Sequence, residues 1–258
     1  MERPLITSLG NPLIKQARAL RQEKARAESG LFVVEGISHI GEAFDAGWKM
    51  EWLIYSQGLL RSKYADELVS RARDRAQPVS PDVLESIAKK DNPQGIVAIV
   101  HQKRFSITDV PILKSAVALV SPQDPGNVGT ILRTMDAVSA DALFILDGGV
   151  ELYHPSTVRS SMGAIFWKPV IQLSFQEFVL WSRQKDLKLI GTSAHADVEY
   201  GTLVAKTPWA LVLGSEQKGL SQDQIGECDV TVSLPMKGRV SSLNLAVAAG
   251  ILLYSLNK

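Results

Sequence analysis

Arg133 and Glu216 are the charged side chains of this sequence best placed to do chemistry, because each lies in or beside a tightly turning loop. Arg133 follows residues 121–129, which contain two prolines and two glycines. A guanidinium near the start of a helix can meet an anionic group, and it stays charged because its pKa lies above about 12. Glu216 lies in the glycine-rich turn 214–219, which matches neither common phosphate-binding pattern. Because a carboxylate repels anions, we expect a cationic or hydroxyl-bearing ligand there.

A third loop, residues 234–244, adds neutral polar side chains. A Pro and Gly turn is followed by Ser241, Ser242 and Asn244 at the entrance of an apolar final helix. A buried amide destabilises a protein unless it is hydrogen-bonded. Taken alone, each loop also has an ordinary explanation: a surface arginine, a solvated glutamate in a turn, and a capping asparagine.

Short apolar runs precede all three loops and are typical of strands covered on both faces. We expect helical segments to separate most of these strands, as in an open α/β sheet whose ligand site lies at the carboxyl ends of its strands. The predicted strands are residues 116–120, 142–146, 187–191, 210–213 and 230–234, and the predicted helices are residues 127–138, 155–163, 175–185 and 243–256.

An earlier part of the chain shows a smaller α/β pattern. The predicted strands are residues 31–34, 52–55 and 96–100, with helices near residues 12–24, 38–46, 63–75 and 82–89. The polar stretch 102–111, which ends at Pro111, is a candidate linker. We therefore predict two domains, residues 1–105 and 106–258.

Composition narrows the class of protein. The 258 residues are 45% hydrophobic and 21% charged, as in folded globular proteins, and the net charge is only +1. One cysteine and four well-separated histidines argue against a disulfide or a zinc site. The longest apolar stretch, residues 243–256, is shorter than the roughly 20 residues that span a membrane. A cytoplasmic protein without metal is expected.

Together the loops form three motifs: Asn127, Gly129 and Arg133; Gly214, Glu216 and Gly219; and Pro235 to Asn244. In order and internal spacing they resemble the motifs of the SpoU/TrmH class of RNA ribose 2′-O-methyltransferases. The stretch 153–164 is also similar to the segment before the second motif of that class. The resemblance covers about residues 110–258.

The N-terminal region is similar to the L30e-like substrate-binding domain often fused in front of this catalytic domain. The similarity lies in residues 30–36 and in residues 92–98, which begin with Asn92 and Pro93. The resemblance implies a C-terminal α/β domain with a deep trefoil knot, and a homodimer with active sites beside the subunit interface. The apolar final helix suits burial in a core or against a second subunit.

The resemblance also implies roles for particular residues. Arg133 would stabilise the developing alkoxide of the ribose and grip the adjacent phosphate, and Glu216 would hold that arginine or a substrate hydroxyl. The remaining expected catalytic residues are Asn127, Ser242 and Asn244. The expected S-adenosylmethionine site consists of Thr192, Ser193, Ala194, Gly214, Leu234, Met236 and Leu243.

Clustered cations neutralise RNA phosphates, so the basic residues near the N-terminus are candidate RNA contacts. They are Lys15, Arg18, Arg21, Lys24 and Arg26. A solvated basic helix face is the alternative. We expect Phe32 and Trp48 to be core residues rather than surfaces on which bases stack.

The leading functional hypothesis is therefore an S-adenosylmethionine-dependent 2′-O-methyltransferase of ribosomal RNA, acting without a membrane or a metal. The alternatives are a tRNA 2′-O-methyltransferase and an RNA-binding relative that does little catalysis. A dinucleotide-dependent oxidoreductase is remote, because the sequence lacks GxGxxG.

Overall fold

The computed structural model of the chain describes residues 3–88, 94–110, 113–194, 196, 198–206 and 208–257. Asn92, Pro93 and Pro111, which the sequence analysis singled out, lie outside the described residues. The chain forms two compact units, Met1–Lys103 with Tyr153–Phe166, and Arg104–Leu152 with Trp167–Lys258. Residues 153–166 belong to the predicted second domain by sequence, yet they pack with the first unit.

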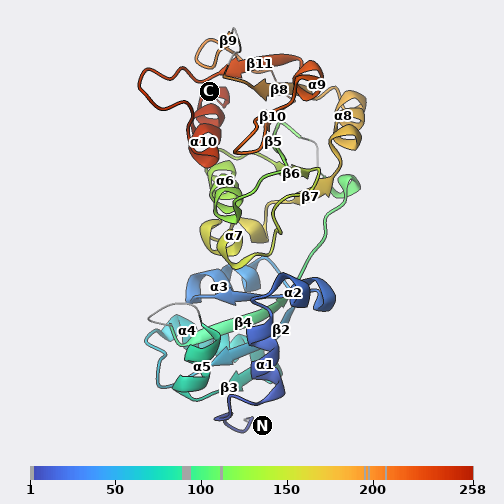
Figure 1. Ribbon diagram of the computed structural model, residues 1–258. Helices are drawn as coiled ribbons and strands as arrows, with labels where there is room; N and C mark the ends of the chain where they lie inside the picture. Colours follow the sequence, from blue (N-terminus) through green and yellow to red (C-terminus); the bar gives the residue numbers. More distant parts are fainter. Residues whose placement is uncertain are drawn as a thin grey trace. The chain divides into compact units, whose positions relative to one another are not determined.

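The first unit is built on a four-stranded sheet with the order β1-β4-β2-β3 (Figure 1). β4 is antiparallel to β1 and β2, and β3 is parallel to β2. In chain order its elements are α1 (Pro12–Ala19), α2 (Glu23–Ser29), β1 (Leu31–Glu35), α3 (Ile37–Asp45), β2 (Met50–Tyr55), α4 (Lys63–Ala72), the 3₁₀ helix η1 (Arg73–Arg75), β3 (Ala76–Pro78), α5 (Pro81–Ile87), β4 (Ile96–His101), α7 (Pro155–Ser160) and η3 (Ala164–Phe166).

The single helix predicted over residues 12–24 is wrong, because two helices occupy this region. α1 starts at Pro12 after Asn11, whose side chain accepts a hydrogen bond from Leu13 N at 2.9 Å. It ends at Ala19, and Gln22 is extended before α2 begins. The carbonyl of Leu20 accepts a hydrogen bond from Arg26 Nη1 at 2.7 Å, which compensates for the helical bond lost at the break.

Aromatic side chains join residues 153–166 to the rest of the first unit. Phe32 and Trp48 are buried, as the sequence predicted for core residues, and the ring of Tyr153 lies 4.6 Å from that of Phe32. Trp48 Nε1 donates a hydrogen bond to Phe166 O at 2.8 Å, and Lys103 N donates one to the Tyr153 hydroxyl at 3.0 Å. Hydrogen bonds and aromatic contacts therefore fix this segment at both of its ends.

The second unit is built on a seven-stranded sheet with the order β7-β6-β5-β10-β8-β11-β9, in which every neighbouring pair is parallel. Its elements are η2 (Ile107–Asp109), β5 (Ser115–Val120), α6 (Pro125–Ala137), β6 (Ala142–Leu146), β7 (Val170–Leu173), α8 (Phe175–Gln184), β8 (Lys188–Thr192), β9 (Val198–Glu199), β10 (Trp209–Leu213), α9 (Gln222–Gly226), β11 (Val230–Ser233) and α10 (Leu245–Leu256).

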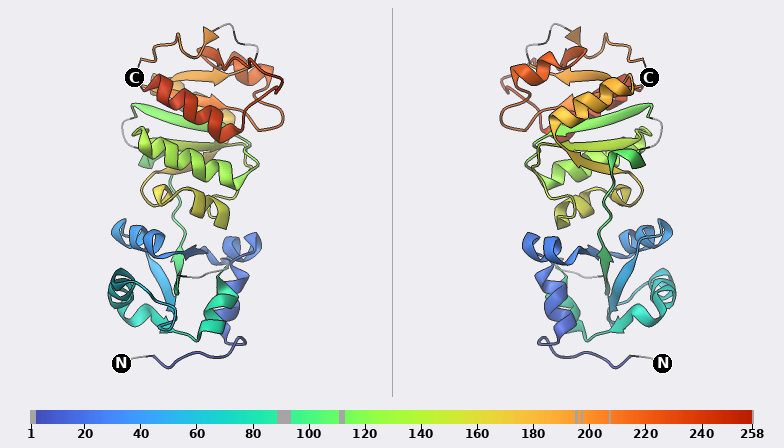
Figure 2. Two further views of the ribbon diagram at one scale, coloured as in Figure 1. Left: turned by 90° about the vertical axis from the view of Figure 1, so that its left-hand side faces the viewer. Right: turned by 90° about the vertical axis from the view of Figure 1, so that its right-hand side faces the viewer.

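Helices cover both faces of this sheet, α6 and α10 on one side and α8 and α9 on the other (Figure 2). β5, β6 and β10 are buried along their whole length, which explains why their sequences are apolar without alternation. The five strands predicted for this region all form, each within one residue of its expected ends. The sequence analysis missed β7, β9 and α9, which are only two to five residues long.

Among the helices in the described part of the chain, none combines the length and the apolar character that a bilayer crossing requires.

Candidate functional site

Three loops meet at the carboxyl ends of the parallel strands. Residues 121–124 follow β5, residues 214–220 follow β10, and residues 234–244 lie between β11 and α10. β10 lies between β5 and β8, and β11 is the next neighbour of β8. The first loop, which precedes the other two by 90 residues or more in sequence, therefore shares one edge of the sheet with them.

Glu216 joins the second loop to the first. Its Oε2 atom accepts a hydrogen bond from Gln123 N at 2.9 Å, and its Oε1 atom accepts from Asp124 N at 3.2 Å and from Asn127 Nδ2 at 3.0 Å. The carboxylate thus binds the end of the first loop and the start of α6. These partners do not include Arg133, which the resemblance suggested as one contact of the carboxylate. The contact with a substrate hydroxyl stays a prediction.

Asn127 extends the connection to the third loop. Its Oδ1 atom accepts a hydrogen bond from Asn244 Nδ2 at 2.9 Å. Asn244 caps α10, because its Oδ1 atom accepts from Ala246 N at 2.9 Å and Val247 N at 3.3 Å. One side chain from each motif, Glu216, Asn127 and Asn244, therefore forms a continuous hydrogen-bonded chain, which we call the three-loop network.

The network favours the ionised form of Glu216. Partial burial raises the pKa of the Glu216 carboxyl, but hydrogen bonds from Asn127 and from nearby backbone amides outweigh this effect. The net result is a pKa below the usual carboxyl value. Glu216 therefore accepts hydrogen bonds as a carboxylate at neutral pH.

Residues with positive φ angles lie where the first loop meets the loop after β6. Ser121 and Asp147, at the ends of neighbouring strands β5 and β6, have φ angles of 46° and 55°. Gly149 (φ 111°) approaches so closely that a Cβ atom there would lie 2.4 Å from Pro122 O. Only glycine fits this contact, which the sequence analysis missed although the Gly148-Gly149 pair was a visible signal.

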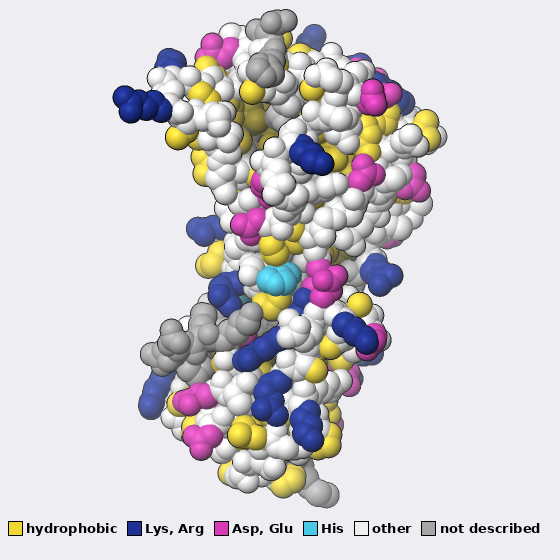
Figure 3. Space-filling view, in the orientation of Figure 1, with side chains coloured by type: hydrophobic (Ala, Val, Ile, Leu, Met, Phe, Trp, Pro, Cys, Tyr) yellow, Lys and Arg dark blue, Asp and Glu magenta, His cyan; other side chains and the backbone are white. Residues whose placement is uncertain are grey.

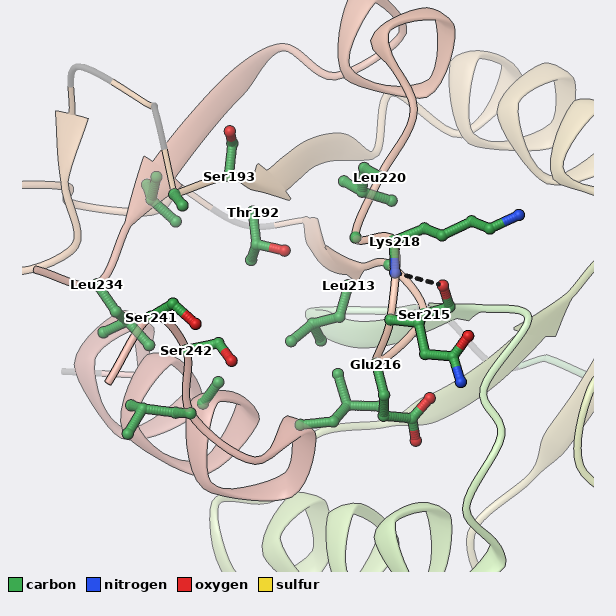
Figure 4. A pocket seen from close by; sticks show the side chains of 18 of the residues that line it. Thr192, Ser193, Leu213, Ser215, Glu216, Lys218, Leu220, Leu234, Ser241 and Ser242 are labelled. Atoms are coloured by element: carbon green, nitrogen blue, oxygen red, sulfur yellow. Dashed lines mark hydrogen bonds between the residues drawn. The ribbon is translucent and has the colours of Figure 1, made fainter. Parts of the chain in front are cut away.

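A pocket of about 580 Å³ opens beside the network (Figure 4). Every residue predicted to bind the cofactor lines it, together with Glu216 and Ser242. Ser241 and Ser242 lie across the opening from Thr192, whereas the side chain of Lys218 extends away from it (Figure 4). Leu245, Ala248 and Leu252 of α10 also line the pocket, and the sequence analysis did not identify them.

The pocket suits a nucleoside-type cofactor with an apolar body. Its volume lies in the range of about 300–1,000 Å³ that is typical of small-molecule sites, and apolar side chains alternate with hydroxyls on its wall. At Gly214 a Cβ atom would lie 1.9 Å from the Gly219 carbonyl carbon, so only glycine fits where the two ends of this turn meet. Among the described residues that line the pocket, Glu216 is the only acidic one, and the first loop already binds its carboxylate.

Arg133 lies outside both the pocket wall and the network. Its side chain is exposed on α6, and within the described residues the guanidinium makes no hydrogen bond or ion pair. α6 packs against α10, with Gly250 facing Thr134. Of the five residues expected to be catalytic, Glu216, Asn127 and Asn244 form the network, Ser242 lines the pocket, and Arg133 lies apart from both. Their catalytic roles stay predictions.

The basic residues near the N-terminus do not all face solvent, although Lys and Arg side chains are spread over the visible face of the first unit (Figure 3). Lys15 and Lys24 are exposed. Arg18 Nη2 donates to Leu9 O at 2.6 Å, and Arg21 Nη2 donates to carbonyls at the end of α5, including Ser86 O at 3.2 Å.

Arg26 corrects the prediction of an RNA contact. It is 1% exposed, and its guanidinium binds the carbonyl of Leu20. A buried side chain that is engaged with the backbone cannot also neutralise a phosphate, so Arg26 stabilises the α1–α2 junction instead.

Metal ligation has no visible candidate in the described ranges, which contain no group of three or more His, Cys, Asp or Glu residues able to hold an ion. Cys228 is partly buried, and burial together with the charge of Asp229 raises the pKa of its thiol to about 11. It is a structural residue.

Comparison with known families gives two matches that together span most of the chain. A model of the SpoU rRNA Methylase family matches residues 114–254. A model described as an MRM3-like substrate binding domain matches residues 11–98.

Individual relatives are similar over nearly the full length. The chain is 32% identical over 91% of its length to 85% of a 23S rRNA (uridine(2479)-2′-O)-methyltransferase of Streptomyces viridochromogenes. It is 27% identical over 97% of its length to 98% of the 23S rRNA (guanosine(2553)-2′-O)-methyltransferase RlmP of Bacillus subtilis. An AdoMet-bound rRNA methyltransferase from Sinorhizobium meliloti has a similar structure, with a TM-score of 0.89, 33% identity, and coverage of 98% of this chain and 96% of that one.

Proposed function

Because the chain belongs to the SpoU rRNA methylase family, we propose that it transfers a methyl group from S-adenosylmethionine to a ribose 2′-hydroxyl of 23S ribosomal RNA. The observation that carries this proposal is the pocket at the ends of β8, β10 and β11, whose wall includes all seven residues expected for the cofactor. A similar protein binds AdoMet, which supports the same cofactor here. The proposed location of the protein is the cytoplasm, since its proposed substrate is ribosomal RNA.

The cofactor supplies an electrophilic methyl group on a sulfonium, and the protein supplies position and charge. The backbone around Thr192, Gly214 and Leu234 would hold the nucleoside, with Met236 and Leu243 packed against it. Arg133, which is always charged, would bind the phosphate beside the target ribose and stabilise the alkoxide that develops on the 2′-oxygen. An oxygen of that phosphate would accept the proton that the 2′-hydroxyl loses. The three-loop network would fix α6, and with it Arg133, relative to the pocket.

A homodimer would complete the site. Val247, Ile251 and Tyr254 form an exposed stripe on α10 and are 50%, 36% and 62% accessible. α10 packs against α6, which carries the exposed Arg133. A second copy covering both helices would bury the stripe and bring Arg133 toward a pocket of the partner subunit.

A deep trefoil knot is the expected topology for this family. In this chain the knot would involve the loop after β10, the loop after β11 and α10, which together line the pocket. The division into an RNA-binding N-terminal domain of residues 1–105 and a catalytic domain of residues 106–258 is part of the same proposal, and the two family matches support it.

The target nucleotide is not inherited from the relatives, because one of them modifies a uridine and another a guanosine. An assay with unmodified 23S rRNA and S-adenosylmethionine labelled on the methyl group tests the function. We expect wild-type protein to label the RNA, and Arg133→Ala to lose at least 100-fold in rate while calorimetry gives an unchanged cofactor affinity. Near wild-type turnover of Arg133→Ala would refute the assigned role.

A further inference from the structure

Trp167 is an exposed aromatic side chain whose polar edge is fixed. Its indole Nε1 donates a hydrogen bond to Asp136 Oδ1 at 2.8 Å, yet the residue is 44% exposed. The Nζ atom of Lys168 lies 3.4 Å from the same carboxylate oxygen. Asp136 therefore orients the indole, and Lys168 offsets the negative charge that would otherwise repel a nearby phosphate.

The same carboxylate brings Trp167 close to Arg133. Asp136 and Arg133 are three residues apart on α6 and are therefore neighbours on the helix surface. Helix geometry separates their Cα atoms by about 5 Å, so the indole nitrogen lies within about 12 Å of the Arg133 Cα atom. Along an RNA strand, at about 3.4 Å per stacked nucleotide, this distance is covered in three or four steps.

We infer that Trp167 is a stacking surface for an unpaired base within about four nucleotides of the methylated one, and that the substrate site is consequently single-stranded RNA. The inference rests on the proposed function, in which Arg133 binds the phosphate beside the target ribose. Aromatic side chains of RNA-binding proteins stack mainly on the unpaired bases of single strands, loops and bulges, because paired bases within a helix have their faces covered. An indole already fixed by Asp136 loses little conformational freedom when a base covers it.

Substitution of Trp167 tests the inference by separating RNA binding from the chemical step. With unmodified 23S rRNA, Trp167→Ala is expected to raise KM for RNA about tenfold, as for loss of one stacked base, and to leave kcat within twofold. Trp167→Phe keeps an aromatic face and should stay within threefold of wild type. Leu180→Ala removes another exposed apolar side chain of the same unit, on α8 and 65% exposed, and should change neither constant.

Fluorescence gives a readout that does not depend on catalysis. A single-stranded oligoadenylate should quench part of the wild-type tryptophan emission, and this part should be missing in Trp167→Phe. The same strand paired with oligouridylate should quench much less.

The outcomes separate this inference from the proposed function. Unchanged KM in Trp167→Ala, or equal quenching of wild type and Trp167→Phe, would overturn the stacking role while methyl transfer by wild type continued. Conversion of Trp167→Ala to a smaller species on gel filtration would overturn it as well, because Trp167 would then be a subunit contact. If wild type methylated no RNA, the proposed function would fail, and the quenching experiment would still decide whether Trp167 stacks on bases.

Discussion

Replacing Asn127 with alanine should both destabilise the second unit and disable catalysis. Asn127 is 7% exposed and makes two side-chain hydrogen bonds, one to the Glu216 carboxylate and one from Asn244. A hydrogen bond to a charged group contributes about 1.5–3 kcal/mol and a neutral one about 1 kcal/mol, so the expected loss is about 3 kcal/mol. For a unit of this size, the melting temperature should fall by about 6 to 12 °C.

Calorimetry and methyl transfer measured on the same preparation test this prediction. Because the lost bonds hold the first loop rather than line the pocket, kcat/KM for RNA should fall much more than cofactor affinity. Asn127→Asp should be worse than Asn127→Ala, since it sets a second carboxylate against Glu216 Oε1 at about 3 Å. Thr130→Ala, which removes an exposed bond to Gly126 O on the same helix, is the matched control and should cost less than about 0.5 kcal/mol. A melting temperature within 1 °C of wild type in Asn127→Ala would refute the three-loop network as a stabilising element.

Other consequences follow from single residues. Arg26→Ala should lower the melting temperature and leave the salt dependence of RNA binding unchanged. Lys15→Glu should flatten that salt dependence and leave the melting temperature unchanged. The opposite pattern would mean that Arg26 contacts RNA. Because the pKa of Glu216 is lowered in the folded protein, its contribution to stability is present above the ordinary carboxyl pKa of about 4.3 and is lost as the pH falls through the lower folded value. Wild type should therefore lose more stability than Glu216→Gln between pH 5 and pH 3 in thermal melts, and parallel curves would contradict this. With a pKa of about 11, the Cys228 thiol should react with iodoacetamide at pH 8 only on unfolding, as followed by mass spectrometry, and rapid labelling of folded protein would show the thiol to be open. Gly149→Ala should reduce kcat without abolishing cofactor binding, because the added methyl group displaces the first loop at Pro122; unchanged kcat would show that the loop tolerates displacement.

The central strands of the second unit were predictable, because strands that are buried on both faces are apolar throughout. β5, β6 and β10 are buried on both faces, so unbroken runs of Val, Leu, Ile, Ala and Phe mark them. The break between α1 and α2 was not predictable, because it depends on Arg26 reaching the Leu20 carbonyl, a contact that the run of charges concealed. An arginine in a run of charged residues can therefore still be buried and hydrogen-bonded to the backbone.

The candidate site likewise has residues that could be predicted from the sequence and contacts that could not. The resemblance to the SpoU/TrmH class supplied the seven residues expected to bind the cofactor, and all seven line one pocket at the carboxyl ends of parallel strands. The partners of Glu216 were not predicted, because two of the three donors are backbone amides that any sequence carries. The close approach of Gly149 to Pro122 likewise depends on which loops are neighbours at the sheet edge, and that follows from strand order rather than from local sequence.

The most direct test of the central claim is the chemical position of the transferred methyl group. After reaction of the protein with labelled S-adenosylmethionine and unmodified 23S rRNA, alkaline hydrolysis cleaves every linkage that has a free 2′-hydroxyl. Ribose methylation predicts that the label appears in alkali-resistant dinucleotides from one position of the RNA. Label recovered in mononucleotides would mean that a base is methylated, and would contradict the account.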